Sequence, residues 1–274
     1  MKNVGQKFMF IYQNLMLNVL DLCSGIGGFS LGLEQTGFFN TVAFCENDNF
    51  CKKVLRKHWK DVTIYNDLLK IGNDPSKIKE TFDVVVSGLP CQPYSLAGKQ
   101  KGKEDDRHLW DYMFKIIKYK KPTWVIFENI PNFVTMALDD MCLDLESENY
   151  STQSFIIPAC GVGAPHKRDR LWVIAKIMGN TSSNGWVETN TNKKTNRVIN
   201  ESKERRMFKP PRTGAHYQKL NLNQWFSKSS VCRVSDGVPS QLDRDRIKAL
   251  GNAIVPHIAF NIGLTIKTLY RNKI

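Results

Sequence analysis

The sequence predicts an α/β fold, in which helices cover both faces of a doubly wound, mostly parallel sheet. From residue 17 to about residue 176, short apolar segments with strand character alternate with helical patterns, and this alternation is typical of βαβ units. Several apolar segments end in glycine, proline or a carboxylate, and open α/β sheets place their chemistry at such strand ends.

The individual elements follow from hydrophobic pattern and turn residues. The predicted strands are 17–22, 40–46, 62–65, 83–87, 123–128, 153–157 and 170–177. The predicted helices are 28–36, 48–58, 75–80, 109–119 and 136–148. A helical pattern returns from about residue 242, and Pro256 breaks it because proline lacks the amide hydrogen that a helix interior uses.

The chain of 274 residues is long enough for one large or two modest domains. We expect a peripheral N-terminal extension at 1–16 and a main domain that combines 17–177 with 242–274. Between its two parts, 178–241 is rich in Asn, Thr, Ser and Lys and has little periodicity, so we expect a small irregular module there.

Composition narrows the class of protein. Seven cysteines without CxxC spacing argue against a disulfide framework and against a metal site, and they favour the cytosol. No apolar run reaches the ~18 residues that a membrane-spanning helix needs, and no signal peptide is expected.

The net charge is +13, and most of the excess is local. Residues 176–233 carry twelve Lys or Arg against three Glu and no Asp, interleaved with aromatic residues. Such a mixture of basic and aromatic side chains is suited to bind a polyanion whose bases can stack on aromatic rings. A solvated, partly disordered insert has the same composition.

A glycine-rich turn follows the first predicted strand, in the segment 21–34. Gly25 and Gly27 let the backbone approach a ligand closely, although the spacing is not GxGxxG, because Ser30 stands at the third position. Glu46 ends the next strand, where an acidic side chain can accept hydrogen bonds from ribose hydroxyls. Asp67 follows the third strand and is either a turn aspartate or a partner for an adenine amino group.

Cys91 lies on a Pro-Cys-Gln turn after an apolar strand, and it is a candidate nucleophile. A lone cysteine is more often a small buried hydrophobe. Glu128 ends another apolar strand, where burial would raise its pKa and suit it to donate a proton. Arg168 and Arg170 share one face of a later strand, which by itself is also a plain charged strand start.

These segments occur in a characteristic order: the glycine turn, Pro90-Cys91-Gln92, Glu128-Asn129, the Arg168/Arg170 pair, and Gly251-Asn252-Ala253. In this order they resemble the DNA (cytosine-5-)-methyltransferase family, over about residues 17–177 and 231–262. The resemblance implies a Rossmann-like domain that binds S-adenosylmethionine and transfers its methyl group to carbon 5 of a flipped-out cytosine.

The resemblance also implies roles for residues. Cys91 would attack carbon 6 of the cytosine, Glu128 would hold or protonate ring nitrogen 3, and Arg170 with Arg168 would bind the base and a nearby phosphate. The residues implied to bind the cofactor are Cys23, Gly25, Gly27, Glu46, Asp67, Pro90, Leu109, Asn252 and Ala253. No metal is implied.

DNA contacts are expected from a glycine- and lysine-rich loop after Cys91 and from the basic module, which would recognise the target sequence. The residues expected to touch DNA are Ser95, Lys99, Gln100, Lys101, Arg205, Arg206, Arg212 and Arg233. The implied partners are double-stranded DNA and, in a restriction–modification pair, a cognate endonuclease. We expect a monomer in the cytoplasm of a prokaryotic or phage-host cell, without membrane contact.

The chain departs from the family pattern at three positions: Cys23 where phenylalanine is common, His166 where glutamine is usual, and Ala253 where serine is common. None of these removes a catalytic group. Three alternatives stay open: an RNA substrate as in the tRNA-directed branch, a nucleic-acid-binding protein with a vestigial site, and a nicotinamide-dependent oxidoreductase. The intact set Cys91, Glu128 and Arg170 opposes the second, and the glycine spacing opposes the third.

Overall fold

The computed structural model describes residues 16–90, 107–135, 137–179 and 240–271. The chain divides into two compact units, Met1–Met178 with Val234–Ile274, and Gly179–Arg233. Only Gly179 of the second unit is among the described residues, so everything below concerns the first. The expected N-terminal extension, apart from Met16, lies outside the described residues, as does nearly all of the expected irregular module.

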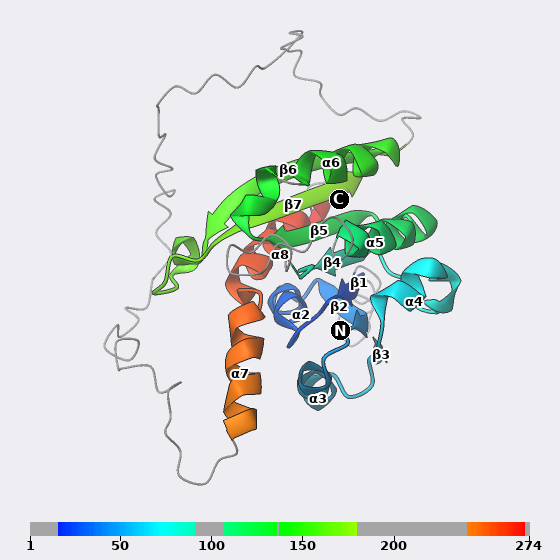
Figure 1. Ribbon diagram of the computed structural model, residues 1–274. Coiled ribbons are helices and arrows are strands. Elements are labelled where there is room, and N and C mark those ends of the chain that lie inside the picture. Colours follow the sequence, from blue (N-terminus) through cyan, green and yellow to red (C-terminus); the bar gives the residue numbers. More distant parts are fainter. Residues whose placement is uncertain (1–15, 91–106, 136, 180–239, 272–274) are drawn as a thin grey trace, which may run out of the picture. The chain divides into compact units, whose positions relative to one another are not determined.

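In the described part of the chain, seven strands form one sheet in the order β3-β2-β1-β4-β5-β7-β6, which confirms the predicted doubly wound α/β fold (Figure 1). β1, β2, β3, β4 and β5 are parallel, whereas β7 is antiparallel to both β5 and β6. The strands are β1 (Leu17–Leu22), β2 (Phe39–Cys45), β3 (Thr63–Tyr65), β4 (Val84–Ser87), β5 (Trp124–Asn129), β6 (Tyr150–Pro158) and β7 (Asp169–Ile177).

Alternating side chains of the strands supply two apolar cores, one on each face of the sheet. Leu20 and Leu22 belong to the core that α5 (Arg107–Lys120) and α6 (Leu138–Ser147) cover. Leu17 and Val19 point to the opposite core, against α2 (Gly28–Glu34) and α8 (Pro256–Arg271). The result is a three-layer arrangement with the C-terminal helix α8 beside α2.

The remaining helices are α3 (Asn49–His58), α4 (Leu68–Asn73) and α7 (Ser240–Asn252). The predicted break at Pro256 is confirmed, because α7 ends at Asn252 and α8 begins at the proline. The predicted helix at 75–80 is wrong: only Pro75–Lys77 forms a short 3₁₀ turn, and the helix lies earlier, as α4. Asp67 starts α4 by accepting a hydrogen bond from Leu69 N at 2.9 Å. Six residues are too few for the hydrophobic period to be recognised in the sequence.

One stretch, Arg244–Tyr270, runs across α7 and α8 and has the length and apolar composition of a membrane span, since an 18-residue window within it reaches a mean hydropathy of 1.4. The sequence-based expectation that no apolar run would be long enough for a membrane-spanning helix was wrong. However, Ile258, Ile262 and Ile266 of α8 pack into the core against α2. Core helices pass the same test of length and composition, so the stretch is weak evidence for a membrane.

Candidate functional site

A cavity of about 550 Å³ lies at the carboxyl ends of the parallel strands. Its walls include the segments that follow β1, β2, β3, β4 and β5, together with residues of β7 and α7. The sheet order reverses between β1 and β4, and open α/β sheets bind ligands at such a switch point. The volume is within the range of small-molecule and cofactor sites.

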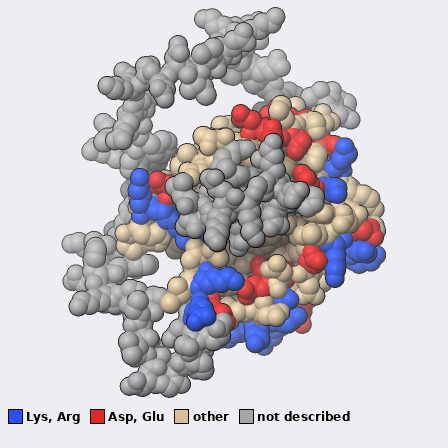
Figure 2. Space-filling view, viewed as in Figure 1, with Lys and Arg blue, Asp and Glu red and all other residues tan. Residues whose placement is uncertain are grey.

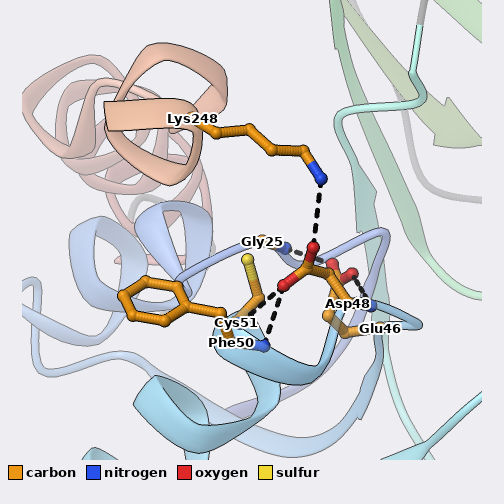
Figure 3. Close-up of polar contacts among 6 residues, drawn as sticks. All are labelled: Gly25, Glu46, Asp48, Phe50, Cys51 and Lys248. Carbon is orange, nitrogen blue, oxygen red and sulfur yellow. Dashed lines mark hydrogen bonds and ion pairs between the residues drawn. The ribbon is translucent and has the colours of Figure 1, made fainter. Parts of the chain in front are cut away.

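The glycine turn and the end of β2 are joined by one carboxylate. Glu46 Oε2 accepts a hydrogen bond from Gly25 N at 2.7 Å, and Glu46 Oε1 accepts one from Asp48 N at 2.8 Å (Figure 3). Gly25 has a φ of +55° and open space beside it, because a Cβ there would meet no atom within 4 Å. The turn therefore leaves room for a ligand next to a buried carboxylate.

Asp48 links the N-terminus of α3 to α7. Its Oδ1 caps α3 by accepting hydrogen bonds from Phe50 N and Cys51 N, and its Oδ2 pairs with Lys248 Nζ at 3.2 Å (Figure 3). The backbone hydrogen bond from Cys51, with that from Phe50 and the Lys248 ammonium, lowers the pKa of Asp48 below its usual value. Two segments 200 residues apart thus meet at one wall of the cavity.

Among the described residues, three cysteines line the cavity, and none of them is suited to be a nucleophile. Burial raises the pKa of Cys45 and of Cys51 to about 12, and it raises the pKa of Cys23 well above its usual value. The thiolate is the reactive form of cysteine, so these side chains stay neutral near pH 7. Cys23 occupies the position where the resemblance leads one to expect phenylalanine.

Most of the residues expected to bind the cofactor are brought together here. Those on the cavity wall are Cys23, Gly25, Glu46, Asp67, Pro90, Leu109 and Asn252. Gly27 and Ala253 are beside the cavity rather than on its wall. Gly27 has a φ of +85°, and a Cβ there would lie 2.7 Å from the Trp59 ring, so the glycine serves the close packing of α2 against α3.

Glu128 and Arg170 form an ion pair on the same cavity wall. Arg170 Nε lies 3.2 Å from Glu128 Oε1, and the Glu128 side chain is nearly buried. Burial raises the pKa of Glu128 to about 7, although the guanidinium groups of Arg170 and Arg168 act in the opposite direction. A carboxyl group with such a pKa can hold or release a proton near neutral pH, as the sequence predicts for Glu128.

Arg168 is arranged differently from Arg170. Its Nη1 donates to Gly251 O at 2.9 Å and its Nη2 donates to Ala253 O at 2.8 Å. Gly251 lies in the last turn of α7, and Ala253 lies in the short stretch that connects α7 with α8. Arg168 and Arg170, which the sequence places on one strand face, thus contact different partners: Arg168 contacts backbone carbonyl groups, and Arg170 contacts the Glu128 carboxylate.

The proposed nucleophile Cys91 lies outside the described residues, which stop at Pro90 on the cavity wall and resume at residue 107. The residues expected to contact DNA also lie outside them: Ser95, Lys99, Gln100, Lys101, Arg205, Arg206, Arg212 and Arg233. Within the described part of the chain, no group of three or more His, Cys, Asp or Glu side chains could hold a metal ion.

The sequence analysis missed the contributions of Asp48 and Lys248. Asp48 carries a usable signal, since an aspartate directly before a predicted helix is a preferred N-cap. Lys248 carries none, because its partner is set by the tertiary fold alone. The exposed basic side chains of α3 and α7 include Lys53, Arg56, Arg244 and Arg246. Figure 2 shows Lys and Arg side chains on the surface in the region where Figure 1 places these two helices.

Comparison with known proteins agrees with this geometry. The family model of the C-5 cytosine-specific DNA methylases matches residues 17–236. The chain is 33% identical over 186 residues to the type II methyltransferase M.AplI of Arthrospira platensis, a match that covers 64% of this chain and 52% of the relative. It is 31% identical over 163 residues to M.HhaI of Haemophilus parahaemolyticus, covering 58% of this chain and 48% of the relative. The chain thus spans about half the length of these curated relatives.

Solved structures support the fold. A variant of Spodoptera frugiperda DNMT2 superposes with a TM-score of 0.51 at 23% identity, covering 65% of this chain and 54% of that protein. The S. pombe Dnmt2 methyltransferase also has a TM-score of 0.51, at 18% identity, with a match that covers 62% of this chain and 53% of that protein. Because the family model spans most of the sequence, the chain belongs to the C-5 cytosine-specific DNA methylase family.

Proposed function

We propose that this chain is a DNA cytosine-5 methyltransferase that uses S-adenosylmethionine and a covalent adduct between Cys91 and the target cytosine. The observation that carries the proposal is one cavity that joins a glycine turn and Glu46 to the Glu128–Arg170 pair, beside Pro90. Family membership gives the reaction class, and the cavity supplies groups suited to both reactants.

The residues on the wall fit the cofactor. The open space beside Gly25 admits a nucleoside, and the buried Glu46 carboxylate has lone pairs for ribose hydroxyls in addition to its two backbone contacts. Asp67 and Asn252 line the same cavity and offer further polar contacts. S-adenosylmethionine, when bound, supplies an electrophilic methyl group.

The protein's own residues make carbon 5 of cytosine reactive. The Cys91 thiolate adds to carbon 6, which splits one hard step into easier ones. Glu128 donates its proton to ring nitrogen 3, so that negative charge does not build up on the ring as the carbon–sulfur bond forms. Arg170 holds the Glu128 carboxyl and binds the base or a nearby phosphate. Carbon 5 then takes up the methyl group, with S-adenosylhomocysteine as the leaving group. A base removes the carbon 5 proton as the bond between carbon 6 and Cys91 breaks, and ring nitrogen 3 returns its proton to Glu128.

The target must leave the DNA stack before Cys91 can reach it, at a cost of a few kcal/mol. The positive net charge favours a polyanionic substrate, and phosphate contacts would supply most of the affinity. The relatives named above are type II methyltransferases, which supports a role beside a cognate endonuclease in the cytoplasm of a bacterial cell.

The primary test measures transfer of labelled methyl groups from S-adenosylmethionine to unmethylated genomic DNA and, in parallel, to tRNA. We expect label on DNA, with bisulfite sequencing identifying one short recognition site. Label on tRNA alone would exclude DNA as the substrate, and label on neither would exclude the activity.

The covalent step is tested on a duplex that carries 5-fluorocytosine at the identified site. Fluorine cannot be removed as a proton is, so the adduct should persist as a species that survives denaturation. Cys91→Ser should abolish both the trapped species and methyl transfer, while a buried cavity thiol changed by Cys45→Ser should leave the trapped species in place. Methyl transfer that survives Cys91→Ser would rule out the assigned nucleophile.

A further inference from the structure

The α7–α8 segment, residues 251–255, comprises the end of α7 and the short stretch before α8, and its first two residues form part of the cavity wall although they follow β7 by more than 70 residues. Gly251 and Asn252 line the cavity wall, and Ala253 follows them. The last carbonyl groups of a helix have no partner within the helix, and the C-terminus of a helix attracts positive charge. Arg168 meets both needs, since its two terminal nitrogens donate to Gly251 O and Ala253 O at 2.9 and 2.8 Å.

Ile254 places the same segment against both halves of the site. A Cβ on Gly28 would lie 2.7 Å from Ile254 O, and a Cβ on Gly88 would lie 3.0 Å from Ile254 Cδ1. Gly28 begins the helix after the glycine turn, whereas Gly88 follows β4 just before Pro90. The Cβ position of Gly88 is also only 3.4 Å from Glu128 Oε2. A shift of this segment would therefore disturb the cofactor side and the substrate side together.

The backbone at Arg168 is held in an unfavourable conformation. Its φ is +32°, in the region that favours glycine, and such a conformation costs on the order of 1 kcal/mol or more. It persists only where surrounding contacts fix it. The bidentate grip on Gly251 O and Ala253 O is one such contact, and it leaves Arg170 as the residue of the pair that meets Glu128.

We propose that Arg168 is a positioning residue, which clamps the α7–α8 segment through Gly251 O and Ala253 O and thereby couples cofactor binding to the arrangement of the substrate side. This assigns Arg168 and Arg170 separate tasks, instead of the joint binding of base and phosphate that the family resemblance implies. The cofactor part of the proposal rests on the proposed function, whereas the clamp itself does not.

The clamp is tested first without any ligand, by hydrogen exchange of the full chain over residues 249–258. Arg168→Gln should speed exchange in this stretch by at least tenfold. Arg168→Lys, which keeps the charge and can reach one carbonyl, should give an intermediate rate. Lys167→Gln, which removes an exposed neighbouring charge, and Arg170→Gln should leave exchange unchanged.

The coupling is tested by calorimetric binding of S-adenosylhomocysteine in the absence of DNA. Arg168→Gln should weaken binding about tenfold and Arg168→Lys less, with Arg170→Gln within about twofold of the wild type. If Arg168→Gln changes neither exchange nor binding but abolishes methyl transfer, Arg168 is a substrate ligand and the proposal is overturned. If the wild type binds no S-adenosylhomocysteine while the exchange results hold, the clamp stands and the proposed function fails. Circular dichroism identifies any variant that does not fold. If Arg168→Gln does not fold, the exchange rate and the binding affinity of Arg168→Lys test the proposal instead.

Discussion

Arg170 Nε lies 3.2 Å from Glu128 Oε1, and the pair bridges the neighbouring antiparallel strands β7 and β5. This contact explains why a nearly buried carboxyl group is tolerated at the end of a core strand. Burial raises the pKa of Glu128 to about 7, and Arg170 limits the rise. The carboxyl group can therefore be protonated at neutral pH while it stays anchored.

Methyl transfer should depend on protonated Glu128. Because the acid form donates, kcat should fall as the pH rises through about 7, and Glu128→Gln should lower kcat at least about 100-fold and remove this alkaline limb. Arg170→Gln removes a positive charge that lowers the pKa of Glu128, so the alkaline limb of the pH–rate profile should move to higher pH. Single-turnover rates from pH 5.5 to 9 measure both effects. An alkaline limb that persists in Glu128→Gln would assign it to another group.

Folding stability should fall as the pH rises, because the carboxyl group of Asp21, at the end of β1, has a raised pKa in the folded state. Asp21 is fully buried, and desolvation raises its pKa to about 8, although Ser30 donates to its Oδ2 at 2.8 Å. Between about pH 4 and 8 the native state therefore binds one proton more than the unfolded state, and stability falls by up to about 1.4 kcal/mol per pH unit.

Asp21→Asn should remove this slope and stabilise the protein at pH 7 to 8, because the neutral amide can still accept from Ser30. Urea unfolding at pH 5, 6, 7 and 8 measures it. Asp140→Asn, at an exposed position of α6, is the matched control and should keep the wild-type slope. An unchanged slope in Asp21→Asn would mean that Asp21 is ionised in the native state.

Cofactor affinity should depend on Glu46. Glu46→Gln replaces one of the two oxygens that hold Gly25 N and Asp48 N and removes the negative charge beside the turn. We expect S-adenosylhomocysteine to bind at least tenfold more weakly, which corresponds to about 1.4 kcal/mol, with DNA affinity unchanged. Glu148→Gln, a paired surface carboxylate off the cavity wall, should leave both affinities unchanged. Loss of DNA binding with retained cofactor binding would contradict the assignment.

The contact between α2 and α8 should be sensitive to one methyl group. A Cβ on Gly32 would lie 2.2 Å from Pro256 O and 2.8 Å from Ala259 Cβ, so Gly32→Ala should destabilise the fold by about 1–3 kcal/mol. Gly251→Ala is the control, because a Cβ there meets nothing within 4 Å and alanine favours the helix α7. Thermal unfolding should show a lower Tm for the first and an equal or higher Tm for the second. An unchanged Tm in Gly32→Ala would show that α8 can move away from α2 without loss.

Local patterns were enough to predict the sheet. The strands β1, β4 and β5 are short, mostly apolar segments buried on both faces, and such segments are recognisable without tertiary information. The helix α4 was missed because its six residues depend on the cap at Asp67 and on close packing of Gly72 against Tyr112.

The sequence by itself determined which residues stand at the strand ends, because parallel strands carry their carboxyl ends to one edge whatever the details of packing. Gly25, Glu46, Asp67, Pro90 and Glu128 therefore line one cavity, as the sequence predicts. Only the tertiary structure decided which residues far apart in the sequence contact each other. Arg168 with the α7–α8 segment, and Lys248 with Asp48, meet because α8 packs on α2 and returns the C-terminal segment to the cavity. Such contacts leave no periodic trace in the chain, since they depend on where whole layers pack rather than on neighbouring residues.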